Sequence, residues 1–206
     1  MSYISLPADL FRAVALAAAK NDIRYYLNGV RIELLDGGAA MIVATDGHAL
    51  HFARFAAAHT SPIEMAFTLT SEATQAICKA VGTKPKPGVM IAIGADLEAC
   101  AVDGKQVEPF SVQRMTGTGE IDSNYPQWRR LVNAPFLPNW PAYGLSAHSL
   151  DIAQRAAVIL GGKHAGLLFL KRALNYLYTV GGRDDFAGIC TPPNKLHFKP
   201  GSVPVL

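Results

Sequence analysis

Hydrophobic and polar residues alternate along several short stretches of the chain, and this period of two predicts strands. The clearest alternation covers residues 30–34, is followed by an Asp-Gly-Gly turn at 36–38, and continues in the apolar run 40–43. Residues 49–55 alternate again after the dipeptide Asp46-Gly47. Gly and Asp favour such turns because they tolerate unusual backbone conformations. The pattern therefore predicts three successive strands joined by tight turns.

Three other segments have apolar residues at helical spacing. The first, residues 6–19, has Pro7 where it suits a first helical turn. The second covers residues 71–81, and Ser71 is expected to cap it. The third, residues 149–160, ends before a Gly-Gly pair. The sequence thus predicts three helices, each followed by strands.

This order of helix and then strands occurs three times, although the letters of the three units do not match. The later strands are expected at residues 63–67, 89–93, 97–102, 107–115, 142–147, 166–170, 175–180 and 186–191. Equivalent units of this size are expected to bury their faces against one another. We predict a complete domain of two units at 1–132, a Pro- and aromatic-rich connector at 133–147, a single unit at 148–194 and an irregular tail at 195–206.

Composition narrows the classes of function. Only 17% of the 206 residues are charged, below the roughly 25% of typical soluble domains, so a large buried or self-associating surface is expected. The formal charge of +3 permits a polyanionic partner without requiring one. No apolar stretch is long enough to span a membrane and no secretion signal is evident, which favours a cytoplasmic protein. Cys78, Cys100 and Cys190 lack metal or redox spacing, so we expect free thiols, no metal and no cofactor.

Three short motifs are more specific: DIRYYLNG at 22–29, ATDGHAL at 44–50 and YPQWRRL at 125–131. In this order and at these separations they resemble the middle domain of the bacterial DNA sliding clamp, the DNA polymerase III beta subunit. The resemblance covers residues 1 to about 132. It is weaker from residue 142 onward, where it fits only the closing half of the family's last domain, and the family's first domain has no counterpart in this sequence.

The resemblance implies an α+β clamp fold, built from repeated helix-plus-strands half-domains with antiparallel sheets outside and helices on the inner face. It also implies a non-enzymatic processivity factor that surrounds or cradles duplex DNA and tethers polymerase or repair proteins. A clamp loader is a further implied partner. Because the family's ring contains twelve half-domains and this chain would supply three, four chains would close an equivalent homo-oligomeric ring.

The family binds short apolar peptide motifs of its partners in a groove. The matching positions in this sequence are Leu27, Thr45, Gly47, His48, Leu50, Pro126, Arg130, Leu131, Ile189, Thr191 and Pro192. A small groove with apolar walls and a few polar groups at its rim suits such peptide anchors. The family usually has Arg after the His of this motif, and here Ala49 stands instead. This change puts the partner preference of the groove in question.

The second implied site is a DNA-facing surface. Arg24, Tyr25 and Tyr26 match a family loop that touches the duplex, and Lys20 lies just before them. Basic groups attract phosphates without regard to base sequence. The two tyrosines are adjacent in a predicted strand or strand entry, so they point to opposite faces: one of them is expected in the core, and only the other can meet DNA. Three further cations fall one on each predicted helix: Arg12, Lys79 and Arg155.

Two other functions remain open from the sequence. The first is an interaction module of the clamp fold that binds clamp-binding peptides, or a clamp itself, without forming a ring. The second is a hydrolase in which Asp46 orients His48 as a general base. The sequence lacks a Gly-x-Ser-x-Gly elbow or a positioned cysteine, which favours a simple turn at Asp46-Gly47.

Overall fold

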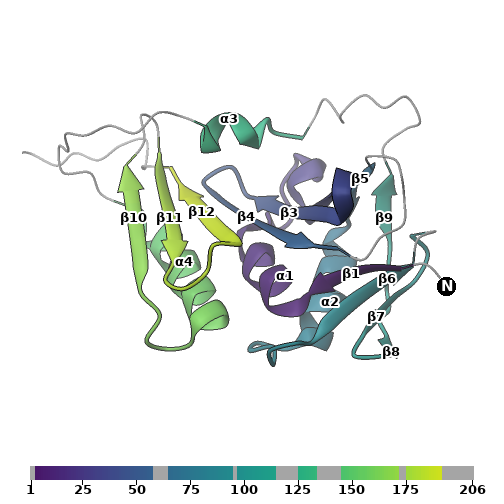
Figure 1. Cartoon of the computed structure of the whole chain (residues 1–206). Coiled ribbons are helices and arrows are strands. Elements are labelled where there is room, and N and C mark those ends of the chain that lie inside the picture. The colour runs from purple at the N-terminus through teal and green to yellow at the C-terminus, as the bar shows by residue number, and fades with distance from the viewer. Residues whose placement is uncertain are drawn as a thin grey trace, which may run out of the picture.

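The computed structural model describes residues 3–57, 65–94, 97–114, 125–133, 145–171 and 175–191, which form two antiparallel sheets with helices packed against them (Figure 1). The larger sheet has eight strands in the order β10-β11-β12-β4-β3-β2-β5-β9. In chain order these are β2 (Val30–Leu35), β3 (Ala39–Thr45), β4 (Ala49–Ala56), β5 (Met65–Leu69), β9 (Val112–Arg114), β10 (Leu167–Lys171), β11 (Tyr176–Val180) and β12 (Phe186–Cys190). The expected strands at 30–34, 40–43 and 49–55 are confirmed, and the turn at Asp36–Gly38 between the first two has positive φ angles at both Gly37 and Gly38.

The smaller sheet contains a strand that the sequence did not predict. Its order is β1 (Tyr3–Pro7), β6 (Met90–Gly94), β7 (Cys100–Val102) and β8 (Lys105–Gln106). Leu6 and Pro7 pair with β6, so the first helix begins at Ala8 and not at Leu6. Pro7 can end this strand because β1 is at the edge of its sheet, where a missing N–H is tolerated.

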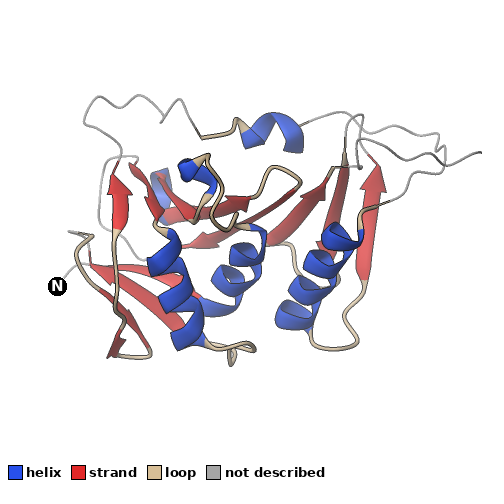
Figure 2. Ribbon diagram, turned by 180° about the vertical axis from the view of Figure 1, so that it is seen from behind, coloured by secondary structure: helices blue, strands red, loops and turns tan. Residues whose placement is uncertain are grey.

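Three helices lie side by side on one face of the sheets (Figure 2). They are α1 (Ala8–Val14), extended by the 3-10 turn Ala15–Ala17, α2 (Ser71–Val81) and α4 (Ala147–Gly161). The cap of α2 is Thr70 and not Ser71, because the Thr70 hydroxyl accepts from the N–H of Ala73. The hydroxyl of Ser146 caps α4 in the same way, because it accepts from the N–H of Ser149.

Several strand boundaries differ from the prediction. The strand expected at 142–147 is wrong in its described part, because residues 145 and 146 belong to no strand and Ala147 begins α4. Residues 142–144 lie outside the described part. The strand expected at 107–115 shortens to Val112–Arg114, and that expected at 97–102 shortens to Cys100–Val102. Residues 134–144 of the connector predicted at 133–147, and the tail at 195–206, also lie outside the described residues.

The large sheet buries a different set of side chains on each face. On the face toward α1 and α4, the main core includes Ile32, Ala53 and Tyr178. On the opposite face, the short helix α3 (Trp128–Val132) covers a second cluster, which we call the outer cluster (Figure 1). Its buried members are Val43, Leu50, Tyr125, Trp128, Leu177, Ala187 and Ile189.

The end of the described chain joins the first group of strands directly. β12 pairs antiparallel with β4, and the register places Ile189 opposite Leu50 and Cys190 opposite Ala49. Figure 1 shows the resulting continuous sheet, with β10, β11 and β12 at one end beside β4. Residues separated by about 140 positions in the sequence therefore share one surface.

A buried polar link crosses the same junction. The ring of His51 on β4 contacts the carbonyl oxygen of Ala13 in α1 through Nδ1 at 2.7 Å, and its Nε2 bonds to the hydroxyl of Tyr178 on β11. A carbonyl oxygen can only accept, so Nδ1 carries the proton and Tyr178 donates to Nε2. Burial lowers the pKa of His51 to about 4, although the Ala13 carbonyl opposes the shift. The imidazole is therefore neutral at pH 7.

Candidate functional site

The turn at residues 45–49 is fixed by its own side chains. The Thr45 hydroxyl donates to the carbonyl of Ala49 at 2.7 Å and accepts from the N–H of Gly47 at 3.0 Å. The Asp46 carboxylate accepts from the N–H groups of His48 and Ala49, both at 2.8 Å. Gly47 has a φ of 90°, which favours glycine. The predicted turn is confirmed, and Oδ1 of Asp46 accepts two hydrogen bonds from the backbone of this turn.

A residue at the start of α4, in the third helix-and-strands unit, contacts this turn. Nε2 of His148 lies 2.8 Å from Oδ2 of Asp46. Burial opposes ionisation of Asp46, but hydrogen bonds from the Ala49 backbone, from His148 and from the His48 backbone keep its pKa below the ordinary value. Asp46 is therefore an anion that ties the turn to α4.

Arg24, expected to face DNA, is held by groups of its own chain. It donates to the carboxylate of Asp22 through Nε at 3.0 Å and through Nη2 at 2.7 Å, and this side-chain bond lowers the pKa of Asp22 to about 2. Nη2 also lies 3.3 Å from the carbonyl oxygen of Asp46. The guanidinium packs so closely on Gly47 that an added Cβ there would lie 3.1 Å from Nη1. Arg24 thus lies beside the 45–49 turn, with its charge shared with Asp22.

The two tyrosines do not lie in a strand as expected, because Tyr25–Leu27 forms a 3-10 helix. Local hydrogen bonds favour this turn, since the amide of Asn28 bonds Asp22 in both directions, at 2.7 and 2.9 Å. Leu27 is buried, whereas Tyr25 is 56% exposed and Tyr26 is half-buried. The expectation that one tyrosine belongs to the core is therefore wrong, and Leu27 has that place.

The structure brings three of the predicted groove residues together on the outer face of the large sheet. Leu50 and Ile189 are buried in the outer cluster, and Leu131 of α3 packs against it. Thr191 donates through its N–H and its hydroxyl to the carbonyl of His48, both at 2.9 Å, which fixes the chain after β12 beside the turn. The other described positions lie in the turn (Thr45, Gly47), next to α3 (Pro126), on α3 (Arg130) and in the Tyr25–Leu27 helix (Leu27). Pro192 lies outside the described residues.

Sequence reasoning missed the contacts that hold α3 on this surface. The carboxylate of Glu33 on β2 accepts from Trp128 and Arg129 of α3. The alternation in β2 was a usable signal, because it places Arg31 and Glu33 on the face opposite Ile32. It could not show that α3, about 95 residues later, covers that face.

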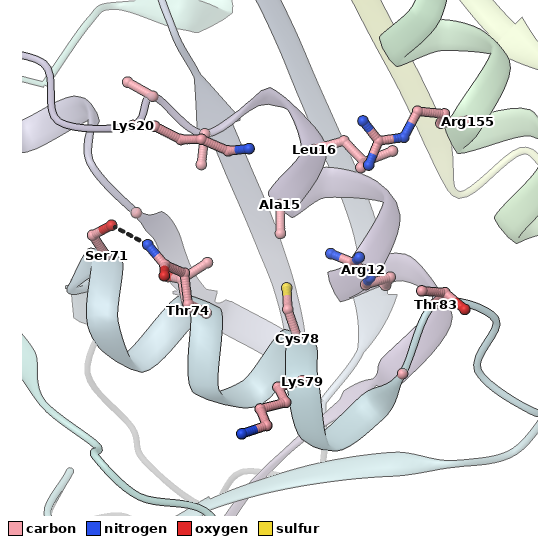
Figure 3. A pocket seen from close by; sticks show the side chains of 15 residues that line it. Arg12, Ala15, Leu16, Lys20, Ser71, Thr74, Cys78, Lys79, Thr83 and Arg155 are labelled. Atoms are coloured by element: carbon pink, nitrogen blue, oxygen red, sulfur yellow. Dashed lines mark hydrogen bonds between the residues drawn. The ribbon is translucent and has the colours of Figure 1, made fainter.

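Four of the predicted DNA-facing cations gather on the opposite side of the molecule. Arg12, Lys20, Lys79 and Arg155 line one open hollow of about 570 Å³ (Figure 3). The hollow lies between α1, α2 and α4, and Cys78 forms part of its wall. Burial raises the pKa of the Cys78 thiol, although Arg12 opposes the shift. The three cysteines are free, as expected.

A second hollow of about 410 Å³ shares Arg12 and Arg155 and adds Lys84. Arg155 also pairs with Asp151 one helical turn earlier, at 3.4 Å. Within the described ranges, no group of three or more His, Cys, Asp or Glu side chains is arranged to hold a metal ion. The described helices are all too short or too polar to cross a membrane.

Repeated helix-and-strand units with antiparallel sheets on one side and helices on the other define a protein of the DNA clamp class. A family model for the DNA polymerase III beta subunit, central domain, matches residues 6–127. The chain therefore belongs to the DNA polymerase III beta subunit family. The resemblance and the fold class predicted from the sequence are both confirmed.

Solved structures extend the match beyond this domain. A sliding clamp from Pseudomonas aeruginosa has a TM-score of 0.56 at 17% identity, over 94% of this chain and 67% of that clamp. A beta chain from Streptococcus pneumoniae has a TM-score of 0.63 at 13% identity, with shares of 95% and 65%. The Helicobacter pylori beta clamp bound to a DNA ligase peptide has a TM-score of 0.62 at 10% identity, with shares of 94% and 66%.

At these identities the structures establish the fold alone. The chain spans about two thirds of the length of the clamps that it matches. No curated protein sequence matches it.

Proposed function

We propose that this protein is a non-enzymatic, sliding-clamp-like processivity factor that surrounds or cradles duplex DNA and tethers a polymerase or repair protein through a peptide groove. The observation that carries this proposal is the pairing of β12 with β4. This pairing assembles the 45–49 turn, the end of β12 and α3 around one apolar cluster. The cationic hollow lies on the helical face of the same sheet. The molecule thus has one surface for a peptide and another for a polyanion.

In this proposal the part-exposed Leu131 is the apolar wall of the groove, the buried Leu50 and Ile189 support it from beneath, and His48 and Arg130 stand at its rim. A short apolar peptide gains affinity by burying its side chains against such a wall, while rim groups set its orientation. The H. pylori clamp, which shares this fold, is bound to a DNA ligase peptide. That peptide is a suitable first probe for this chain.

The DNA-facing surface in this proposal is the hollow lined by Arg12, Lys20, Lys79 and Arg155. Cations at this spacing attract backbone phosphates without reading bases. The exposed ring of Tyr25 lies on the loop that follows Lys20 and offers a hydroxyl for a further phosphate contact. So few cations favour weak, mobile binding, which suits a protein that slides.

We further propose a ring of four chains, because each chain supplies three of the twelve half-domains of the family's ring. Closed symmetric assemblies are the usual form of homo-oligomers. A native mass near 88 kDa, four times the 22.0 kDa chain, would support the ring. A stable monomer in the presence of duplex DNA would exclude it. A clamp loader would be the natural partner for opening such a ring.

The decisive experiment combines two measurements. A labelled DNA ligase peptide should bind the parent protein and lose affinity in His48→Ala and Arg130→Ala, whereas Lys163→Met, in an exposed turn, should bind as the parent does. Nicked circular DNA should retain the protein at moderate salt, and linearising the DNA should release it. Peptide binding that is unchanged in both groove variants would contradict the groove. Equal retention on circular and linear DNA would contradict encirclement.

A second candidate function is an interaction module of the clamp fold that binds clamp-binding peptides, or a clamp, without circling DNA. The specific observation in its favour is that two of the predicted DNA-facing arginines have acidic partners, Arg24 with Asp22 and Arg155 with Asp151. These two ion pairs reduce the positive charge that the two arginines can offer to DNA. The module predicts peptide binding with no difference between circular and linear DNA, so the same experiment separates the two functions.

A further inference from the structure

A buried carboxylate lies under α3 on the outer face of the large sheet. The side chain of Glu33 is only 10% exposed, and that of Arg31, on the same face of β2, is 3% exposed. Nε of Arg31 donates to Oε1 of Glu33 at 2.9 Å. A charge removed from water is costly unless it is paired and hydrogen-bonded. The other hydrogen-bond partners of Glu33 therefore indicate which part of the structure its charge stabilises.

Those partners are two consecutive residues of α3. Nε1 of Trp128 donates to Oε1 of Glu33 at 3.4 Å, and the guanidinium of Arg129 donates to Oε2. The same guanidinium lies over the Trp128 ring, 4.5 Å from its centroid. The Trp128 ring in turn packs on Phe52 of β4, with the ring centroids 5.3 Å apart. One carboxylate therefore fixes both the indole and the guanidinium against the sheet.

α3 depends on such contacts for its position. It has only five residues, and no side chain caps its N-terminus. Isolated helices shorter than about 12 residues are marginal in water, so a helix of this size is held by tertiary packing. Hydrogen bonds to a charged group are among the strongest contacts of this kind.

We propose that Glu33 is the positioning residue of the peptide groove: it holds α3 at the distance from β4 and β12 that the groove requires. The inference rests on the proposed function, because α3 carries Arg130 and Leu131, two of the proposed groove residues. Glu33 itself touches no peptide in this proposal. It acts through Trp128 and Arg129, which set where Leu131 meets the outer cluster.

The test uses Arg129→Met, Glu33→Gln and the double variant, each measured for affinity toward the labelled DNA ligase peptide. Arg129→Met removes the guanidinium bond from α3 to Glu33 and leaves the Trp128–Glu33 bond and the Arg31–Glu33 pair in place, so it keeps the test valid if Glu33→Gln fails to fold. A second readout follows α3 directly. The chain has two tryptophans, so in a Trp140→Phe background acrylamide quenching reports the accessibility of Trp128 alone.

Each single variant should weaken peptide binding by about tenfold, the size expected for a lost hydrogen bond to a charged group. The double variant should be no weaker than Glu33→Gln alone, because Glu33→Gln already removes the carboxylate that Arg129 binds. Quenching of Trp128 should rise in all three variants. Lys163→Met, which removes a charge from an exposed turn, should change neither readout.

Three results would overturn the proposal. Trp128 could stay protected in both single variants, which would show that Glu33 does not hold α3. Quenching could rise with no loss of affinity, which would show that α3 is not a wall of the groove. The two changes could also weaken binding additively, which would show that they act separately. Failure of the parent protein itself to bind the peptide is a different result, which contradicts the proposed function.

Discussion

At the scale of single residues, Gly188 on β12 lies directly against Tyr178 on β11, which is part of the buried polar link to His51. A Cβ added at Gly188 would overlap the ring of Tyr178, the residue that donates to His51. The phenol is almost wholly buried, so it cannot move aside without displacing the core around it. Glycine is therefore required here for space, with no demand on the backbone conformation.

Gly188→Ala should lower the free energy of unfolding by about 2 kcal/mol or more, the usual range for overpacking a core. Urea denaturation followed by circular dichroism measures the change. Gly166→Ala is the matched control, because an added Cβ there meets no atom within 4 Å. Equal effects of the two substitutions would contradict the steric account of Gly188.

His51 predicts a distinctive dependence of stability on pH. Its pKa is about 4 in the folded chain and near 6.5 when unfolded, so between these values the unfolded chain binds a proton that the folded chain does not. The contribution of neutral His51 to the free energy of unfolding is therefore fully present above pH 6.5. It is lost as the pH is lowered toward 4, by about 3 kcal/mol in total. Urea denaturation at several pH values measures this loss.

His51→Gln should remove this share of the pH dependence, even though it lowers stability at pH 7. Asp22 and Asp46 do not interfere with the comparison, because carboxylates with lowered pKa values lose their stabilising effect mainly below pH 4. The same slope between pH 6.5 and 4 in the parent and in His51→Gln would contradict the assignment to His51.

At the scale of elements, the adjacent residues Thr70 and Ser71 at the start of α2 have different roles. The Thr70 hydroxyl accepts from the N–H of Ala73 at 3.2 Å and also bonds to the hydroxyl of Ser111. The Ser71 hydroxyl instead accepts from the side chain of Gln75 on the helix surface. Thr70→Ala should therefore cost about 1 kcal/mol of stability, the typical value for an N-cap.

Ser71→Ala should cost only a few tenths of a kcal/mol, since its bond is an exposed helix-surface contact. Urea denaturation of the two variants measures the difference. A larger loss in Ser71→Ala than in Thr70→Ala would restore Ser71 as the cap. Ser and Thr are both good N-cap residues, so the sequence alone could not choose between Thr70 and Ser71. Only the backbone conformation shows which of the two neighbours is the cap.

The elements that the sequence predicted best are those with long alternation. β2 and β4 show a clear alternation bounded by turn residues, and their positions follow. β1 was missed because its five residues run directly into α1, so an apolar strand and an apolar helix read as one segment. The Tyr25–Leu27 helix was missed because it depends on side-chain hydrogen bonds between Asp22 and Asn28.

The candidate site was predictable in its residues and not in its contacts. The motif at 44–50 identified the turn, and its pattern of Thr, Asp and Gly explains the observed hydrogen bonds. The bonds from His148 to Asp46 and from Thr191 to His48 join positions more than 100 residues apart. No local pattern encodes such pairs, because they follow from the pairing of β12 with β4.

At the scale of the whole molecule, the continuous eight-stranded sheet separates two surfaces of different chemistry. The outer face has an apolar cluster under α3, and the helical face has cations around the open hollow. The strands β2, β3, β4, β11 and β12 of this sheet are buried along most of their length. A protein bound on one surface and a nucleic acid bound on the other would therefore not compete for space.

This separation predicts that changes in the hollow alter binding to duplex DNA and leave peptide binding unchanged. The double variant Lys20→Met, Lys79→Met removes two cations from the hollow. If each contacts one phosphate, the plot of log K against log salt should become less steep by about 2, since each neutralised phosphate contributes a slope near 0.9. Fluorescence anisotropy with a labelled duplex between 50 and about 200 mM salt measures this slope.

The control for this experiment is Lys105→Met together with Lys163→Met, which removes the same charge from exposed positions on β8 and beyond α4. Non-specific attraction depends on net charge and would fall equally in both double variants. Binding through the hollow would change the slope only for Lys20 and Lys79. Equal slopes for the two double variants would therefore place the DNA contact elsewhere. An unchanged affinity for the peptide in both variants would not alter this conclusion.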